Sequence, residues 1–211
     1  MFNKIQLKQV LAEYKKVFIQ HQWPNEKYKW EAVQCFQNNW DINSPDFAQM
    51  LKKSLDQVGN LLASANNFPA KMIIGFAEAA PEEVRSMYME LYNESKDLCK
   101  RIANFKDKSN TLLECHTNGA AQHYQYENAI MAYLWLRYPD KYYIYKFSEV
   151  KAVSSELESD YRFKKGAYVD NIRNFMALYD EICAELQQDD ELRNLLNSQI
   201  TSTCYADPEL R

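Results

Sequence analysis

The residues best suited to bind a charged ligand lie between Tyr133 and Tyr168, where aromatic side chains are interleaved with bases. Residues 133–147 carry seven aromatics, three bases and one acid: Tyr133, Trp135, Tyr138, Tyr142, Tyr143, Tyr145, Phe147, Arg137, Lys141, Lys146 and Asp140. Residues 161–166 form a second basic and aromatic stretch. Aromatic rings can stack on unpaired bases, and lysine and arginine neutralise phosphates. We therefore predict nucleic-acid contacts from Arg137, Lys141, Tyr143, Lys146, Arg162, Lys164 and Lys165.

The same aromatic stretch also has a purely structural interpretation. Residues 141–147 read KYYIYKF, nearly alternating, and they are the only good strand candidate in the chain. Alternate tyrosines on a strand place half of their rings in the core, and tyrosine is an ordinary residue on a half-buried sheet face. The sequence leaves both interpretations open.

A nuclease is a further alternative, because Pro139-Asp140 and Glu149-Val150-Lys151 match the pattern PD…ExK. In that pattern two carboxylates, here Asp140 and Glu149, hold a divalent metal, and a lysine, here Lys151, positions the attacking water. Both strings are short and common. Glu149 is equally suited to the first turn of a helix, where an acid interacts favourably with the helix dipole.

Other catalytic and cofactor sites find little support in the sequence. His116 and His123 lack the HxxxH or CxxC partners of a zinc site, so we expect no metal site. The four glycines do not form GxxxxGK[ST] or GxGxxG, so we expect no nucleotide cofactor in this stretch of chain. We also expect no catalytic residues. Five widely spaced cysteines indicate a reducing compartment, and we expect a cytoplasmic protein. The sequence contains no run of about 18 apolar residues, so no membrane span is predicted.

Helical periodicity recurs along most of the 211 residues and few glycines are available for turns, which predicts a mainly α-helical single domain over residues 1–211. At most a short strand or hairpin is expected near residues 141–147. Helices are predicted at 5–18 (ending near Trp23-Pro24), 26–38, 44–62, 81–105, 122–138, 148–158 and 168–187. Ser44 is the expected N-cap of the third of these helices, Asp189 opens a last short helix, and 106–110 is expected to be a solvated loop.

Several stretches of the sequence together resemble one family. They are Trp30-Glu31-Ala32, Asn39-Trp40-Asp41, Pro81-Glu82-Glu83-Val84-Arg85, His123-Tyr124-Gln125 and Lys141-Tyr142-Tyr143-Ile144-Tyr145-Lys146. From about Trp30 to Tyr179 the chain is similar to the N-terminal region of methylcytosine-specific restriction subunits of the McrB type. In that family this region recognises DNA, often modified, a C-terminal AAA motor hydrolyses GTP or ATP, and a separate nuclease subunit cuts. The resemblance implies a non-catalytic DNA-recognition domain from a longer chain, with DNA and a nuclease subunit as partners.

A protein-interaction scaffold is the main alternative to DNA recognition. The net charge of −4 and the acidic stretch from Asp180 to Glu191 do not show the basic footprint of a chain that coats nucleic acid. Such a scaffold would present an exposed apolar patch, with Trp23 and Trp30 as candidates.

Overall fold

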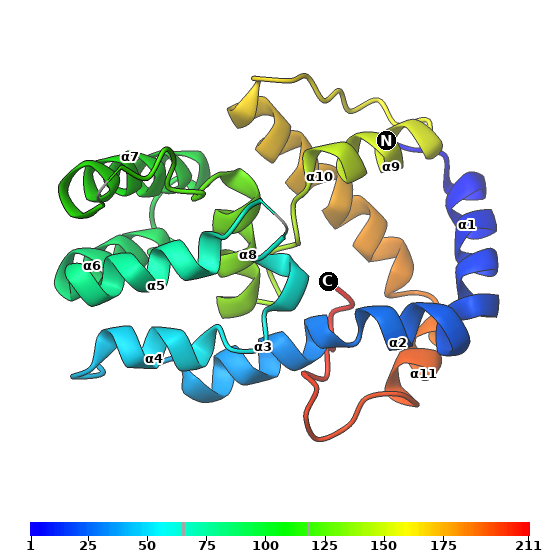
Figure 1. Cartoon of the computed structure of the whole chain (residues 1–211). Helices are drawn as coiled ribbons and strands as arrows, with labels where there is room; N and C mark the ends of the chain where they lie inside the picture. Colours follow the sequence, from blue (N-terminus) through cyan, green and yellow to red (C-terminus); the bar gives the residue numbers. More distant parts are fainter. Residues whose placement is uncertain (65, 118) are drawn as a thin grey trace.

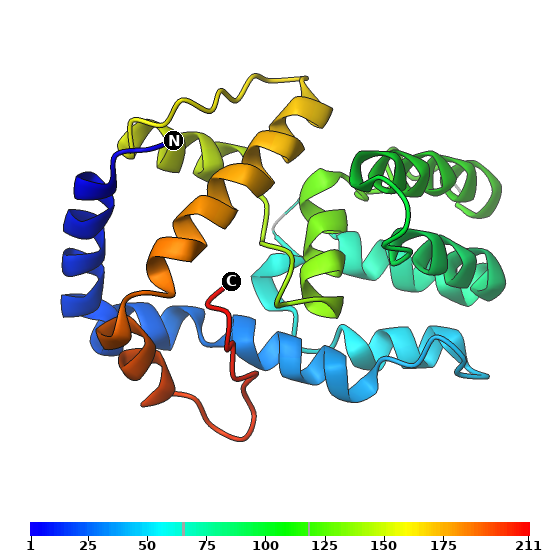
Figure 2. The same cartoon turned by 180° about the vertical axis from the view of Figure 1, so that it is seen from behind.

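A single central helix, α8, organises the packing of the chain. The computed structural model describes residues 1–64, 66–117 and 119–211. The helices are α1 (Lys4–Val17), α2 (Trp23–Glu26), α3 (Tyr28–Asn39), α4 (Phe47–Ser54), α5 (Pro69–Ala79), α6 (Pro81–Leu91), α7 (Leu98–His116), α8 (Glu127–Arg137), α9 (Phe147–Glu156), α10 (Tyr168–Leu186) and α11 (Asp190–Asn197). Figures 1 and 2 show α4–α7 on one side of α8 and α1, α2, α9, α10 and α11 on the other, with α3 passing beneath α8.

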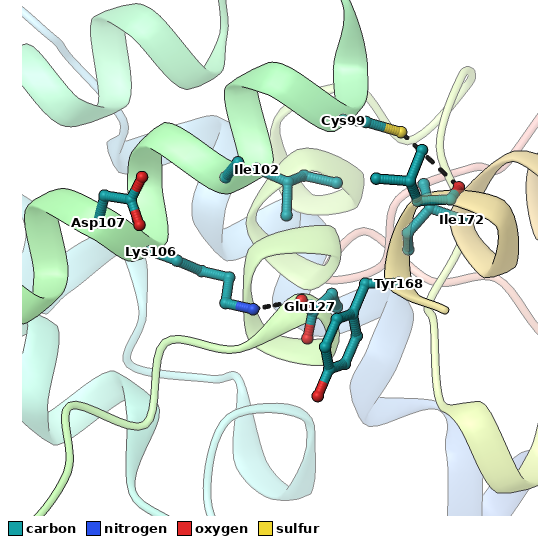
Figure 3. A pocket seen from close by; sticks show the side chains of 9 residues that line it. Cys99, Ile102, Lys106, Asp107, Glu127, Tyr168 and Ile172 are labelled. Atoms are coloured by element: carbon teal, nitrogen blue, oxygen red, sulfur yellow. Dashed lines mark hydrogen bonds and ion pairs between the residues drawn. The ribbon is translucent and has the colours of Figure 1, made fainter. Parts of the chain in front are cut away.

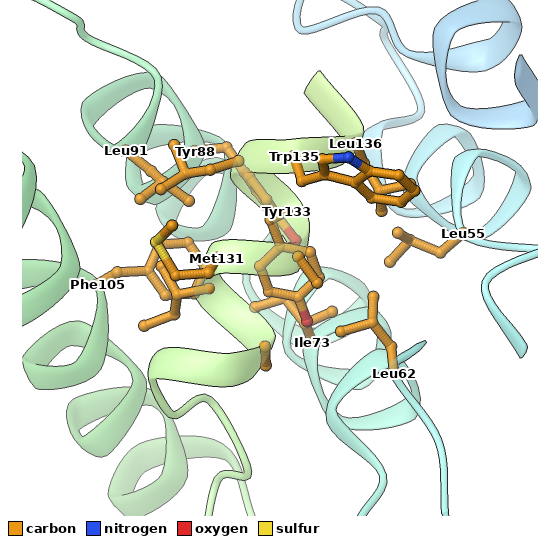
Figure 4. Close-up of a cluster of buried hydrophobic side chains, with 14 of the residues drawn as sticks. Leu55, Leu62, Ile73, Tyr88, Leu91, Phe105, Met131, Tyr133, Trp135 and Leu136 are labelled. Atoms are coloured by element: carbon orange, nitrogen blue, oxygen red, sulfur yellow. The ribbon is translucent and has the colours of Figure 1, made fainter. Parts of the chain in front are cut away.

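Helix α8 is buried around its whole circumference. Every residue from Ala129 to Leu136 is 5% exposed or less, as expected for a helix that is apolar on all faces. Rings and aliphatic chains from α4–α7 surround it, among them Tyr88 and Phe105 (Figure 4). The one buried hydroxyl at its centre, that of Tyr133, donates to Gln125 Oε1 at 2.8 Å. The main core therefore lies between α8 and the helices that enclose it.

A smaller second cluster joins the two ends of the chain. Phe18, Trp23, Leu196 and Cys204 are buried there, with the half-buried Trp30 packed against them. Because these tryptophans lie inside the cluster, they do not form the exposed patch that the scaffold alternative would use. Between α1 and α2 the path continues through a π-helical turn, Phe18–Gln22. The predicted break near Trp23-Pro24 is absent, because Pro24 lies in the first turn of α2, where its missing N–H costs nothing.

Side-chain caps set several helix starts. Asn3, Asp46, Asp97 and Asp189 each accept hydrogen bonds from backbone N–H groups of the first helical turn. The predicted start at Asp189 is confirmed. The prediction of Ser44 as a cap is wrong, because Asp46 caps α4 by accepting from Gln49 N at 3.0 Å. The same helix ends at Ser54 and not at Leu62, and a turn with Gly59 at φ +48° follows it.

Two predicted elements between residues 81 and 116 are also wrong. The expected helix 81–105 is divided into α6 and α7, since Asp97 caps a new helix. The expected loop 106–110 lies inside α7. Its lysines make ion pairs across the fold: Lys106 Nζ is 2.5 Å from Glu127 Oε1, and Lys108 Nζ is 2.9 Å from Glu90 Oε2. The polar run is thus one face of a long helix.

The prediction of a mainly α-helical single domain is confirmed, but no strand forms at residues 141–147. Within the described residues the only β-type pairing is an isolated bridge between Ser64 and Asn67. Residues 142–146 run without helix or strand structure between α8 and α9. Tyr142, Tyr143 and Tyr145 are all at least 94% buried, so the segment does not alternate between core and solvent.

Candidate nucleic-acid interface

Two of the predicted contact residues, Lys146 and Lys165, line a cavity of about 380 Å³ where α8, α9 and α10 begin. A second cavity of about 220 Å³, between α7 and α10, shares Glu127 and Tyr168 with it (Figure 3). We call the two cavities together the Tyr168 groove. The lining residues used below are Lys106, Glu127, Lys146, Lys165 and Tyr168.

The centre of the Tyr168 groove is an ion pair beneath an aromatic ring. Lys106 Nζ lies 2.5 Å from Glu127 Oε1 and 4.6 Å from the centroid of the Tyr168 ring (Figure 3). Glu127 is only 7% exposed, so Lys106 compensates a carboxylate that burial alone would disfavour. Tyr168 is 55% exposed. Its ring therefore leaves a face in solvent on which a planar group can stack.

Three helix N-termini meet at the groove. Glu127, Phe147 and Tyr168 are the first residues of α8, α9 and α10, and no side chain in the described part of the chain caps these helices. Uncapped first-turn amides carry partial positive charge and accept anions such as phosphate. Acids in the first turns lower this potential. Lys106 pairs with Glu127, and Lys146 Nζ lies 2.5 Å from Glu149 Oε1, whereas Asp170 in the first turn of α10 has no ion pair among the described residues.

The basic loop beside the groove is held in place from α10. Asn171, which is 2% exposed, accepts from Lys164 N at 3.0 Å and donates to Lys164 O at 2.8 Å. The side chains of Lys164 and Lys165 are exposed and make no ion pair with any described residue. The Arg162 guanidinium donates to the carbonyls of Ser159 and Tyr161, so it stiffens the loop while staying exposed.

Arg137 and Lys141 lie at the other end of α8, which at 11 residues is about 16 Å long. Both line a separate polar cavity of about 470 Å³. Lys141 pairs with Glu94, and the Arg137 guanidinium lies 4.9 Å from the ring centroid of the adjacent Tyr138. The structure therefore does not bring these two residues together with the Tyr168 groove.

Tyr143 lies in the core and not at the surface. Its ring is 5% exposed, its hydroxyl donates to Asp180 Oδ1 at 2.8 Å, and it accepts from Arg211 Nη1 at 2.6 Å. Burial and the Asp180 carboxylate raise its pKa well above the usual range. Burial likewise raises the pKa of Tyr145 to about 12. Neither ring is placed to stack on a ligand, which leaves Tyr168 as the exposed aromatic of this region.

The nuclease alternative gains no metal site from the structure. Asp140 accepts a hydrogen bond from Tyr205, and Glu149 lies in the first turn of α9, where the helix interpretation puts it. Among the described residues no group of three or more His, Cys, Asp and Glu side chains could hold a metal ion. His123 is buried and accepts from Gln125 N, while His116 Nε2 lies 3.6 Å from Glu83 Oε2.

The residues that sequence reasoning missed are Lys106, Glu127 and Tyr168. Lys106 was expected in a loop, and the other two only as helix residues. Only Tyr168 has a signal in the sequence, because two adjacent apolar residues, Tyr168 and Val169, begin an amphipathic helix. Both are exposed in the structure. No helix in the described part of the chain has the length and apolar character to cross a membrane. No protein-family model, curated protein or solved structure matches this chain.

Proposed function

We propose that this chain is a non-catalytic DNA-recognition domain that contacts DNA phosphates at the Tyr168 groove. The observation that carries the proposal is the convergence of Lys146, Lys165 and the exposed Tyr168 ring on one cavity where three uncapped helices begin. Helix N-termini and lysines both bind phosphate, and an exposed ring stacks on a base. The resemblance to McrB-type restriction subunits supports DNA as the ligand.

The electrostatics make binding strongly salt-dependent. Arg162, Lys164 and Lys165 supply three cationic side chains beside the groove, while Lys146 is paired with Glu149. If each of the three neutralises one phosphate, log Kd rises with log salt concentration with a slope of roughly 2.7. The net charge of −4 opposes contact elsewhere on the surface, so binding concentrates at this basic rim.

The finer proposal is that the ligand is a modified duplex, and that Tyr168 stacks on a base exposed by the protein. This step rests on the family resemblance and on the exposure of the Tyr168 ring. In the same proposal the motor and the nuclease subunit act outside these residues, so the domain itself supplies recognition alone.

Fluorescence anisotropy with labelled duplexes, unmodified and cytosine-modified, tests the proposal at two salt concentrations. Lys164→Gln/Lys165→Gln is expected to weaken binding at least tenfold and to lower the salt slope by about two. Lys52→Gln/Lys53→Gln, which neutralises two adjacent exposed lysines on α4, is the matched control and should change affinity less than twofold.

A stacking role for Tyr168 predicts that Tyr168→Leu weakens DNA binding by about 1–3 kcal/mol without changing the salt slope. Equal losses from both lysine pairs would contradict the assignment of the surface. Absence of binding to every duplex at low salt would contradict DNA recognition altogether.

A protein-interaction scaffold remains the second candidate, because one observation favours it. Tyr168 and Val169 are 55% and 45% exposed beside the apolar Ile102 and Ile172 of the same groove. Adjacent exposed apolar residues are typical of protein interfaces. Salt-insensitive self-association, measured by analytical ultracentrifugation and abolished by Tyr168→Ser/Val169→Ser, would support this function in place of DNA binding.

A further inference from the structure

A further cavity, of about 270 Å³, lies between α1, α10, α11 and the segment 201–211. Figures 1 and 2 show α1 and the C-terminal end of α10 facing each other, with α11 below them and the last residues of the chain on the α8 side of α10. Five leucines and a valine line it together with the rings of Tyr14, Phe18 and Trp30. At about 30 Å³ per water, the cavity has room for about nine water molecules or one small organic molecule.

The three rings that line the cavity belong to one row of rings, in which Trp23 lies behind the wall and joins Phe18 to Trp30. The Tyr14 and Phe18 centroids are 5.6 Å apart, Phe18 and Trp23 are 5.9 Å apart, and Trp23 and Trp30 are 5.1 Å apart. The faces of such rings carry negative potential and attract organic cations. The wall is therefore apolar but favourable to positive charge.

Two charged residues line the cavity, Asp207 and Arg211, and Asp207 is the more deeply buried of the two. Asp207 is 6% exposed; its Oδ2 accepts from Trp30 Nε1 at 3.1 Å, and its Oδ1 accepts from Arg211 N at 2.9 Å. No Lys, Arg or His side-chain nitrogen of the described residues forms an ion pair with it, so its only donors are a backbone amide and an indole N–H. A buried carboxylate without a cation is costly, because hydrogen bonds from neutral donors only partly replace water.

Arg211, the other charged residue at the cavity, does not compensate Asp207. Its Nη1 lies 2.9 Å from Asp180 Oδ1 and donates to the Tyr143 hydroxyl at 2.6 Å. The charge of Arg211 is thus balanced by Asp180. Arg211 Nε is buried and has no hydrogen-bond partner among the described residues. The cavity therefore has an unsatisfied donor as well, but its only charge without an ion-pair partner in the described chain is that of Asp207.

We propose that this cavity binds a small organic cation, a primary or quaternary amine with a short apolar body. The ammonium group lies beside Asp207 and the rings of Tyr14, Phe18 and Trp30, and the leucines enclose the apolar part. The ring faces attract the positive charge of such a ligand, and its ammonium group supplies the cation that the carboxylate lacks. The inference is independent of DNA binding, since it uses none of the residues of the Tyr168 groove.

Three probes of equal size distinguish the charge that the cavity recognises: phenethylamine, 2-phenylethanol and phenylacetate. Isothermal titration calorimetry on the full chain is expected to show the amine binding at least tenfold more tightly than the alcohol, and no binding of the carboxylate. Asp207→Asn should weaken the amine at least tenfold and leave the alcohol within twofold. Asp160→Asn, at an exposed acid elsewhere, is the matched control and should change nothing.

Tyr14→Leu keeps the cavity apolar and removes one ring, so it should weaken the amine several-fold while the protein stays folded by circular dichroism. Equal affinity for amine and alcohol, or no effect of Asp207→Asn in a folded variant, would overturn the proposal. A preference for phenylacetate would also overturn it, because Arg211 would then be the anchor. No heat with phenethylamine at millimolar concentration would show that the cavity does not serve this ligand class.

Discussion

Asp207 makes the stability of this protein depend on pH in a direction opposite to that of most paired carboxylates. Burial raises its pKa from 3.8 to about 6, and the charge of Asp140 acts in the same direction. The folded state therefore holds the Asp207 proton at pH values where the unfolded chain has released it. Stability from this group is fully present below about pH 4 and is lost as pH rises through about 6.

The size of the effect follows from the pKa difference. A shift of about two units corresponds to about 3 kcal/mol over the full titration, and about 2 kcal/mol of this falls between pH 4.5 and 7.5. Asp207→Asn removes the titrating group. Its amide NH₂ cannot accept a hydrogen bond, so one of the two donors, Trp30 Nε1 or Arg211 N, loses its acceptor, and this lowers the stability of the folded state by about 1 kcal/mol. At pH 7.5 we expect the variant to be more stable than the wild type by about 1–2 kcal/mol.

Urea unfolding followed by circular dichroism at pH 4.5 and 7.5 measures this difference directly. Other groups titrate alike in both proteins, so their contributions cancel when the variant is subtracted from the wild type. The stability difference between the two proteins should change by about 2 kcal/mol between the two pH values. A difference that is the same at both pH values, with equal m-values, would refute an uncompensated buried carboxylate at this position.

Four further substitutions test buried polar contacts and two glycine positions by the same unfolding assay. Arg101→Met should lower the free energy of unfolding by about 3 kcal/mol or more. The Arg101 side chain is 3% exposed and donates to the backbone carbonyls of Leu91 and Lys96 and to the Tyr142 hydroxyl. A loss of stability below about 1 kcal/mol would contradict this. Tyr133→Phe should cost about 1–2 kcal/mol by leaving a buried amide oxygen unpaired, and no loss would show that water replaces the hydroxyl. Gly59→Ala should cost about 1 kcal/mol or more, because φ is +48° and a Cβ would lie 3.2 Å from the Tyr28 ring. Gly75→Ala, in open space within α5, should stabilise the protein by about 0.5–1 kcal/mol. A stabilising Gly59→Ala and a destabilising Gly75→Ala would refute the backbone argument.

The helical class and some of the helix starts could be predicted, because their causes are local. An aspartate followed by acids at 189–191, or a proline followed by two acids at 81–83, fixes a helix start within four residues. Residues 106–110 could not be predicted in the same way. Their lysines are held by Glu90 and Glu127, which lie on other helices. Only the tertiary fold shows that this polar run is a helix face.

The candidate site was predictable in part for the same reason. The basic character of Lys146 and Lys165 is visible in the sequence, but their convergence depends on α9 and α10 starting side by side. A strand at residues 141–147 needs a partner strand, and the described chain does not contain one. Tyr143 is buried instead, where its hydroxyl donates to Asp180 on α10.

The two proposed sites should act independently, because α10 holds them far apart. Tyr168 at its start lines the groove, and Leu186 at its end lines the cavity, so the 19-residue helix separates them by about 28 Å. This distance is more than three times the Debye length of about 8 Å at physiological salt. Asp207→Asn should therefore leave DNA affinity within twofold, and Lys164→Gln/Lys165→Gln should leave phenethylamine affinity within twofold. A larger cross-effect in either assay would require that α10 moves between two positions that both ligands distinguish, since charge alone does not act over this distance.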